Sequence, residues 1–208
     1  MDKFTYETED RNSELEQMEW DNVWWEQTSN SEAARVLYIG DSISCGIRHI
    51  ATERSNGKYL FDGFGTSKAV DNAYFASAVS LFAKQQQRRK IVIFNNGLHG
   101  FHLDDTKEYK EYYEKQVQFL LEEFKGTPVA LVLSTYVVGE DHERVIARNN
   151  GVREIGGKYN LPIIDLYTTS AEYKHLQIQD GVHYTTEGYE KMAEKLLEFI
   201  EEILSESI

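Results

Sequence analysis

Short apolar runs alternate with longer amphipathic stretches along this chain, and this alternation constrains the fold more than any other feature. The runs that predict strands lie at residues 36–39, 59–61, 90–95, 128–134 and 161–166. Three of them are nearly all apolar and lack period-two alternation, which is expected of strands covered on both faces. The stretches that predict helices lie at residues 71–87, 107–124 and 141–159. Together they predict an α/β fold with a parallel sheet between two layers of helices.

The final helix is the clearest of the predicted elements. It follows Thr185 and Thr186, either of which can cap it. Its apolar residues recur at the spacing of one buried helical stripe: Tyr189, Met192, Ala193, Leu196, Leu197, Ile200, Ile203 and Leu204. The acidic side chains between them, from Glu187 to Glu202, indicate a solvated face.

Length and composition indicate one globular domain preceded by an arm. The chain has 208 residues, 41% of them hydrophobic, which is enough for a substantial core. Residues 1–31 are polar and acidic apart from Trp20, Trp24 and Trp25. We expect this amino-terminal arm to pack on a single domain formed by residues 32–208. The alternative is that the tryptophans form an aromatic wall for a sugar or a partner protein.

The charge argues against polyanionic partners. Lys and Arg total 22 against 35 Asp and Glu, for a net charge of −13, so nucleic acid and anionic lipid are repelled. No apolar run approaches the ~20 residues that a membrane span needs. The first ten residues are acidic and lack the apolar centre of a signal peptide. We therefore expect a cytoplasmic protein, or a secreted one if a leader has been removed.

The first predicted strand ends in a serine. The stretch reads Val-Leu-Tyr-Ile-Gly-Asp-Ser from residue 36 to residue 42. In a sheet with strand order 2-1-3-4-5, its carboxyl end neighbours the end of the third strand at residues 95–100, and ligands bind at such ends. Most serines after strands are turn or cap residues. A catalytic role for Ser42 requires a base, an acid that orients the base, and donors for an oxyanion.

His183 is the best candidate for that base among the six histidines. It precedes the final helix in the sequence Asp-Gly-Val-His, with Asp180 three residues earlier. On a tight loop this spacing can place the carboxylate against one ring nitrogen and leave the other free for a serine. The plain alternative is that Asp180 and His183 are turn and capping residues, and local spacing alone favours neither.

The two motifs together resemble those of the SGNH hydrolases, also called GDSL esterases and lipases. The first is Gly40-Asp41-Ser42-Ile43, and the last is Asp180-Gly181-Val182-His183. The resemblance covers about residues 35–205. It implies a three-layer α/β/α, flavodoxin-like domain with a five-stranded parallel sheet in the order 2-1-3-4-5.

The resemblance also implies the roles of the motif residues. Ser42 would be the nucleophile, with its own amide as one oxyanion donor. His183 would be the general base and then the general acid, and Asp180 would orient it. Cys45 is expected to be a small buried residue, and Ser44 is the less favoured nucleophile because the motif does not place it at the turn.

The third block departs from the family pattern. Family members usually carry Gly-x-Asn-Asp there, and the asparagine donates to the oxyanion. Here residues 94–100 read Phe-Asn-Asn-Gly-Leu-His-Gly. Alignment on Gly97 places His99 at the asparagine position, so a ring N–H is our expected donor. Asn96 is the alternative donor, and Asn95 fits a strand-end turn.

The second block of the family supplies a glycine amide to the oxyanion. In this chain it must lie within residues 62–67, Asp-Gly-Phe-Gly-Thr-Ser. We expect Gly65 to be this donor, with Gly63 and Ser67 as alternatives. A phosphate-binding loop is disfavoured because the lysine of such loops is missing.

No metal or cofactor is expected. His99, His102, Asp104 and Asp105 lie close in sequence, but chance clustering is favoured over a metal site because His99 already has a catalytic use. The sequence thus predicts a serine esterase for small acyl esters, acetyl esters on carbohydrates foremost. The alternatives are an acyltransferase, a lysophospholipase or thioesterase, and a non-catalytic binding module on the same scaffold. The partner is then a small-molecule ester, and the oligomeric state is left open.

Overall fold

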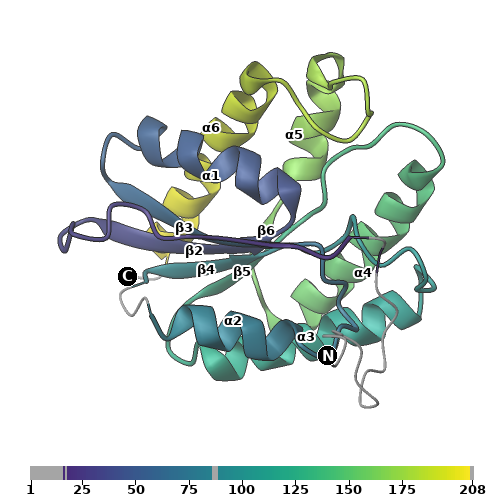
Figure 1. Ribbon diagram of the computed structural model, residues 1–208, viewed down its shortest axis with the longest axis horizontal. Coiled ribbons are helices and arrows are strands. Elements are labelled where there is room, and N and C mark those ends of the chain that lie inside the picture. The colour runs from purple at the N-terminus through teal and green to yellow at the C-terminus, as the bar shows by residue number, and fades with distance from the viewer. Residues whose placement is uncertain (1–15, 17, 86–88, 207–208) are drawn as a thin grey trace, which may run out of the picture.

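A mixed β-sheet between two layers of helices forms the centre of the molecule (Figure 1). The computed structural model describes residues 16, 18–85 and 89–206. Its strands are β1 (Asp21–Trp24), β2 (Ala34–Gly40), β3 (Tyr59–Thr66), β4 (Ile91–Phe94), β5 (Val129–Val132) and β6 (Ile163–Ile164). Its helices are α1 (Ser42–Arg54), α2 (Phe75–Ala83), α3 (Glu108–Glu123), α4 (Asp141–Tyr159), α5 (Leu166–Glu172), α6 (Thr186–Glu206) and the 3₁₀ turn η1 (Lys174–Leu176).

Five parallel strands have the predicted order. Within the described residues the sheet runs β1-β3-β2-β4-β5-β6, so the parallel part is the 2-1-3-4-5 arrangement. Side chains of β2 alternate between the two faces: Val36 and Tyr38 join one core, and Leu37 and Ile39 join the other. Because both faces are covered, β4 and β5 are apolar at every position, and β2 is apolar from Val36 to Ile39. The predicted α/β/α architecture is confirmed.

The sheet has an additional edge strand that the sequence did not predict. β1 pairs antiparallel with the second half of β3, with Asp21 opposite Thr66 and Trp24 opposite Gly63. This pairing extends β3 to Thr66, so most of the segment expected to be a glycine loop after the second strand is itself strand. The expected end of that strand at residue 61 is therefore wrong. The four side chains of β1, Asp-Asn-Val-Trp, are all exposed, so no apolar run marked this strand.

The helices divide between the two faces of the sheet. In Figure 1, α1, α5 and α6 lie above the sheet and α2, α3 and α4 lie below it. The bounds of α4 are those predicted, whereas α2 is shorter than the predicted 71–87 and α5 was not predicted. In α6, the residues Met192, Ala193, Leu196 and Ile200 are fully buried, as the apolar stripe indicated.

The contact between α1 and α6 gives a first testable prediction. An alanine Cβ at Gly46 of α1 would lie 2.5 Å from the Tyr189 ring of α6, far inside van der Waals contact. We expect Gly46→Ala to destabilise the protein by about 1–3 kcal/mol because two packed helices must move apart. Urea denaturation measures this change as a lower midpoint.

Gly157→Ala is the matched control for that prediction. Gly157 lies in α4, and nothing lies within 4 Å of a Cβ built there. We expect this substitution to leave stability unchanged or to raise it by up to about 1 kcal/mol through helix propensity. Equal midpoints for Gly46→Ala and Gly157→Ala would contradict close packing at Gly46.

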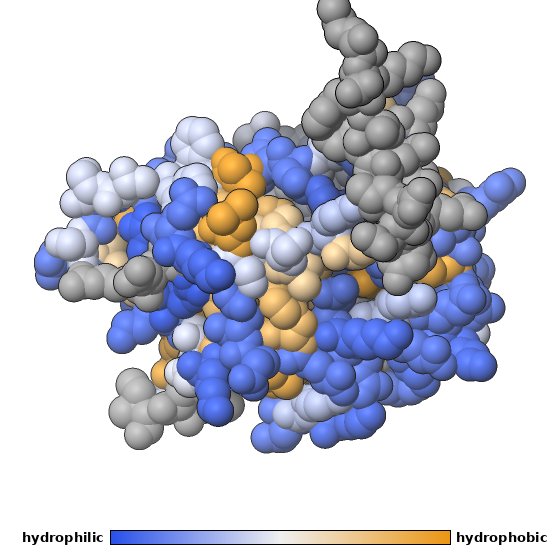
Figure 2. Space-filling model, turned by 60° about the horizontal axis from the view of Figure 1, so that its bottom comes forward, coloured by the Kyte–Doolittle hydropathy of each residue, from blue (hydrophilic) through white to orange (hydrophobic). Residues whose placement is uncertain are grey.

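One face of the molecule is shown in Figure 2 as a mainly hydrophilic surface with apolar residues gathered near its middle. None of the helices in the described part of the chain has the length and apolarity that a membrane span needs.

Candidate active site

Ser42 stands at the sharp turn between β2 and α1. Asp41 has an extended backbone and caps the helix, because its Oδ1 accepts a hydrogen bond of 2.9 Å from the Ile43 amide. Ser42 is the first residue of α1, so its own N–H belongs to the first-turn donors that a helix leaves unpaired. The turn therefore presents a hydroxyl and an amide at the carboxyl end of the central strand.

His183 and Asp180 complete a chain of hydrogen bonds to Ser42. His183 Nε2 lies 2.7 Å from Ser42 Oγ, and His183 Nδ1 lies 2.7 Å from Asp180 Oδ2. Ser42 and His183 are 141 residues apart in sequence. The structure thus brings together the three residues that the sequence placed in one catalytic group. Their side chains are open to solvent, with His183 36% and Asp180 44% exposed.

Asp180 stays ionised over the whole neutral range. Burial by itself would raise its pKa, but the amides of His183 and Val182, followed by the His183 ring, lower this pKa to about 2. A carboxylate at Nδ1 fixes the neutral ring with its proton on that nitrogen. Nε2 is then left as an acceptor for the Ser42 proton.

The loop that carries Asp180 and His183 is held by backbone hydrogen bonds. The Ile178 amide donates to the His183 carbonyl at 2.9 Å, and the Thr185 amide donates to the Leu176 carbonyl at 2.8 Å. Gly181 adopts a positive φ of 71°, which only glycine reaches without strain. This tight geometry places an aspartate and a histidine three residues apart against each other.

The loop after β4 is the predicted third block. Asn95 is turned into the sheet, where its amide donates to the Val132 carbonyl at 3.0 Å. The Asn96 amide donates to the Lys68 carbonyl at 2.7 Å, so it ties this loop to the one after β3. This contact engages one N–H of the Asn96 amide, and the role of Asn96 as the alternative oxyanion donor stays a prediction.

Arg148 of α4 is hydrogen-bonded to the main chain of the same loop. Its side chain is fully buried and donates to the carbonyls of Gly97, His99 and Gly100 and to the carboxylate of Asp105. Arg148 was not among the predicted site residues. The sequence does indicate its burial, because Arg148 lies on the same helical stripe as Val145, Val152 and Ile155, all of which are buried.

His99 lies in a mostly buried position with an acidic neighbour. Its side chain is 16% exposed, and its Nδ1 lies 3.0 Å from Oε2 of Glu16, a residue of the amino-terminal segment. The Trp20 ring packs edge-on against it, with 6.1 Å between ring centroids. No sequence pattern distinguished Glu16 from the other acidic residues around it.

The two candidate glycines of the second block lie at different positions along β3. Gly65 pairs with Gly40, and a Cβ built on Gly65 would lie 2.4 Å from Cys45 Sγ in the first turn of α1. Gly63 pairs with Tyr38 and is covered by Arg48. Gly65 therefore lies nearer the turn that carries Ser42, and its role as an oxyanion donor stays a prediction.

Ser67, the other alternative for the second block, has its hydrogen-bonding groups engaged. Its amide donates to the Trp20 carbonyl at 3.1 Å, and its hydroxyl donates to Glu19 Oε2 at 2.7 Å. These bonds link the second block to the amino-terminal segment. Ser67 is consequently a poor candidate for an oxyanion donor.

The rival nucleophiles are engaged elsewhere. Ser44 is buried, and its hydroxyl donates to the Asp41 carbonyl at 2.6 Å. Burial raises the pKa of the Cys45 thiol, so it stays protonated at neutral pH.

His102 Nε2 lies 2.8 Å from Asp71, so His99 and His102 have different carboxylate partners. Among the described residues no group of three or more His, Cys, Asp or Glu is arranged to hold a metal ion.

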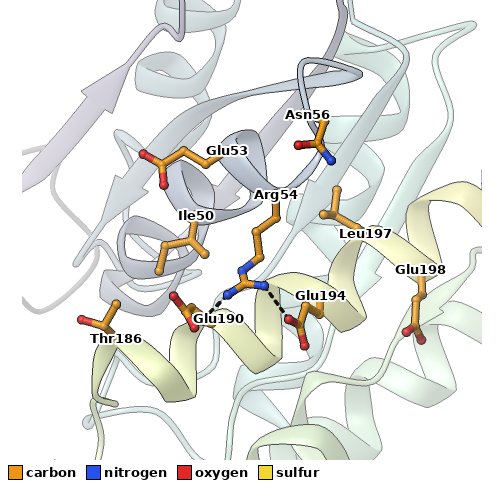
Figure 3. A pocket seen from close by; sticks show the side chains of 9 residues that line it. All are labelled: Ile50, Glu53, Arg54, Asn56, Thr186, Glu190, Glu194, Leu197 and Glu198. Carbon is orange, nitrogen blue, oxygen red and sulfur yellow. Dashed lines mark hydrogen bonds and ion pairs between the residues drawn. The ribbon is translucent and has the colours of Figure 1, made fainter.

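An open groove of about 660 Å³ between α1 and α6 lies apart from this chemistry (Figure 3). Arg54 points into it and forms ion pairs with Glu190 at 2.8 Å and Glu194 at 2.6 Å. None of Ser42, Asp180 or His183 lines the groove. Arg54 and these two glutamates are each more than a third exposed, so the groove is a solvated seam between two helices.

Comparison with solved structures identifies the fold. The chain is similar to an acetyl xylan esterase (TM-score 0.62, 18% identity, 79% of this chain and 98% of that one). It is also similar to a member of the lipolytic protein G-D-S-L family from Veillonella parvula (TM-score 0.66, 21% identity, 80% and 97%). A carbohydrate esterase of family 3 from Talaromyces cellulolyticus is a third such structure (TM-score 0.65, 13% identity, 83% and 99%). The chain has the SGNH hydrolase fold. Comparison with protein-family models and with curated proteins finds no match.

The SGNH fold predicted from two short motifs is therefore confirmed, and it explains why distant segments converge. The motif residues lie at one edge of the sheet: Ser42 follows β2, the His99 loop follows β4, and Asp180 and His183 precede α6. Ligands of open α/β sheets bind at this carboxyl edge. The roles of the individual residues within the SGNH fold stay predictions.

Proposed function

We propose that this protein is a serine esterase that hydrolyses small acyl esters, with acetyl esters of carbohydrates as the favoured substrates. The observation that carries the proposal is the hydrogen-bond chain from Ser42 through His183 to Asp180, at 2.7 Å for each step. A serine, a base and an orienting carboxylate in this geometry are what acyl transfer requires.

The proposed reaction has two steps. His183 Nε2 takes the Ser42 proton as Oγ attacks the ester carbonyl, and the alcohol leaves with that proton as the acyl group stays on Ser42. Water then attacks the acyl-enzyme, His183 takes a proton from it, and the carboxylic acid departs as the proton returns to Ser42. The Ser42 amide, the Gly65 amide and the His99 ring are the proposed donors to each oxyanion. Losing one such donor costs about 3 kcal/mol of barrier, or a hundredfold or more in rate.

Two features support hydrolysis of small esters over the alternatives. The exposed fractions of His183 and Asp180, 36% and 44%, leave the site open to water, which favours hydrolysis over acyl transfer to a second alcohol. An acetyl xylan esterase and a carbohydrate esterase are among the structures that share the fold. These names suggest the substrate class for the present chain.

A panel of esters tests the proposal. We expect a fluorophosphonate probe to label the protein, and we expect kcat/KM to fall by about tenfold or more from p-nitrophenyl acetate to the octanoate. Acetylated xylo-oligosaccharides and lysophosphatidylcholine are the paired natural-type substrates. A protein that neither labels nor hydrolyses any ester is not an esterase. Preference for the octanoate or the lysolipid would leave the esterase proposal standing and remove the small-acyl specificity.

A further inference from the structure

Glu16 connects the amino-terminal segment to the loop that carries His99. Its two carboxylate oxygens lie 3.1 and 3.0 Å from His99 Nδ1, and Oε1 also accepts a hydrogen bond of 3.1 Å from the Gly100 amide. The Glu16 side chain is 21% exposed. A carboxylate that holds a ring nitrogen and the next amide fixes both the orientation of the ring and the path of the loop.

The residues that follow Glu16 tie the same segment to the loop after β3. The Trp20 amide donates to Ser67 Oγ at 2.8 Å, and the Lys68 ammonium lies 2.7 Å from the Asp21 carboxylate. The segment from residue 18 to β1 therefore lies against the end of β3, the strand that carries Gly65, and Glu16 contacts the loop that carries His99. Glu16 is placed by these anchors and not by its own contact alone.

Three carboxylates, those of Glu16, Asp41 and Glu19, act on the His99 ring. Glu16 is hydrogen-bonded to Nδ1, and the charge of Asp41, the residue before Ser42, also acts on the ring. Asp41 is buried, and its Oδ2 has no hydrogen-bond partner among the described residues. Burial lowers the pKa of His99, but Glu16, Asp41 and Glu19 together outweigh burial and raise this pKa above its ordinary value. The pKa of Glu16 is lowered, although burial opposes it, chiefly by His99.

The hydrogen bond to Glu16 decides what a neutral His99 could do. If Nδ1 carries the single proton of a neutral ring and donates it to Glu16, Nε2 is a bare acceptor and cannot stabilise an oxyanion. A doubly protonated ring donates to Glu16 from Nδ1 and retains an N–H at Nε2. We propose that Glu16 is a positioning residue that holds His99 as an imidazolium, with its Nε2–H serving as a charged oxyanion donor in place of the family's asparagine amide.

This inference rests on the proposed esterase function and gives it a specific pH dependence. Activity must fall in alkali as the His99 ring loses its second proton. The charged groups that face the His99 region are Glu16, Glu19, Asp41 and, through main-chain carbonyls, Arg148; Arg144 acts on Glu16, and His183 acts on Asp41. Of these, Glu16 is the one that is hydrogen-bonded to the ring.

The test uses the full-length protein and four variants. Glu16→Gln keeps the side-chain shape and removes its charge, and His99→Asn installs the family's residue. The double variant Glu16→Gln/His99→Asn closes the cycle. Glu32→Gln is the control, because Glu32 is an exposed glutamate whose Oε1 accepts from the Ser31 hydroxyl and whose amide donates to Asn30 Oδ1. The readouts are kcat/KM for p-nitrophenyl acetate between pH 5 and 10 and an NMR titration of the His99 ring.

We expect Glu16→Gln to move the alkaline limb of kcat/KM to lower pH, with a loss of about tenfold at pH 8.5 and less than about twofold at pH 6. His99→Asn should lack that limb, because an amide does not titrate, and Glu16→Gln should have no further effect in that background. The NMR titration of His99 should shift in the same direction as the limb. Glu32→Gln should match the wild type in both readouts.

Three results would overturn the proposal. One is an equal loss in Glu16→Gln at every pH, which indicates a structural role only. Another is an effect of Glu16→Gln that persists in the His99→Asn background. The third is an NMR titration in which the wild-type ring deprotonates at or below the ordinary pKa of histidine. An absence of any ester hydrolysis in the wild type is a different failure, since it removes the esterase function itself and the catalytic role of His99 with it.

Discussion

Replacing Ser42 with alanine is expected to remove hydrolysis of p-nitrophenyl acetate almost entirely, with kcat falling by about 10⁴-fold or more. The substitution deletes the one atom that lies 2.7 Å from His183 Nε2 and leaves no nucleophile for an acyl-enzyme. Labelling by a fluorophosphonate should disappear in parallel. The fold should be kept, because the side chain that caps α1 is Asp41 and not Ser42.

Ser44→Ala is the matched control for that variant. Ser44 lies one position beyond Ile43 on the same helix, and its hydroxyl donates to the Asp41 carbonyl instead of to a base. We expect Ser44→Ala to keep full labelling and to retain kcat within about tenfold, because only a buried hydrogen bond near the turn is lost. Labelling that survives in Ser42→Ala and is lost in Ser44→Ala would move the nucleophile to Ser44 and contradict the assignment.

The sheet and the triad geometry could be predicted from the sequence for a physical reason. Buried parallel strands must be apolar on both faces, so β2, β4 and β5 are visible as short apolar runs without any alignment. The motifs at Ser42 and His183 lie on tight turns. The glycines that these turns require, Gly40 and Gly181, are visible in the sequence. Local chemistry and global topology therefore indicate the same edge of the sheet.

What the sequence did not reveal depends on contacts between distant segments. β1 is four residues, Asp-Asn-Val-Trp, with all side chains exposed, and it is a strand only because β3 offers it an edge. Pairing of this kind is set by the partner and leaves no periodic pattern. The same pairing converts the expected glycine loop into strand and places Gly63 under Arg48.

The contacts of Glu16 and Arg148 illustrate the same limit at the site. Each carries a charge that the sequence would assign to solvent, yet Arg148 is fully buried against three carbonyls and Glu16 is bonded to His99. A buried charge is tolerated only where hydrogen bonds satisfy it, and those partners come from other elements. For this reason the choice between His99 and Asn96 as the oxyanion donor depends on their hydrogen-bond partners. The Asn96 amide donates to the Lys68 carbonyl, and the His99 ring is hydrogen-bonded to Glu16.

Asp180→Asn is the second variant with a large expected effect. The Asp180 carboxylate fixes the proton of His183 on Nδ1. An amide at the same place donates from its NH₂ group, so His183 Nδ1 becomes an acceptor and the ring proton moves to Nε2. Nε2 then faces Ser42 as an N–H group and cannot accept the serine proton. We expect kcat to fall by about 10³–10⁴-fold. The loop should keep its shape, because an amide oxygen can still accept from the Val182 and His183 amides.

The pH dependence and a second aspartate complete this test. The pKa of Asp180 is lowered to about 2, so the carboxylate is ionised at every pH above about 3, and the favourable charge it supplies is lost only as the pH falls toward that value. Titration of Asp180 therefore leaves the rate unaffected across the neutral range. Asp165→Asn is the control, because Asp165 Oδ1 also accepts a hydrogen bond from a main-chain amide, that of Thr168, but Asp165 lies outside the triad. A kcat for Asp180→Asn within tenfold of that for Asp165→Asn would show that the carboxylate does not orient the base, and His183 would then act on Ser42 as an unassisted dyad.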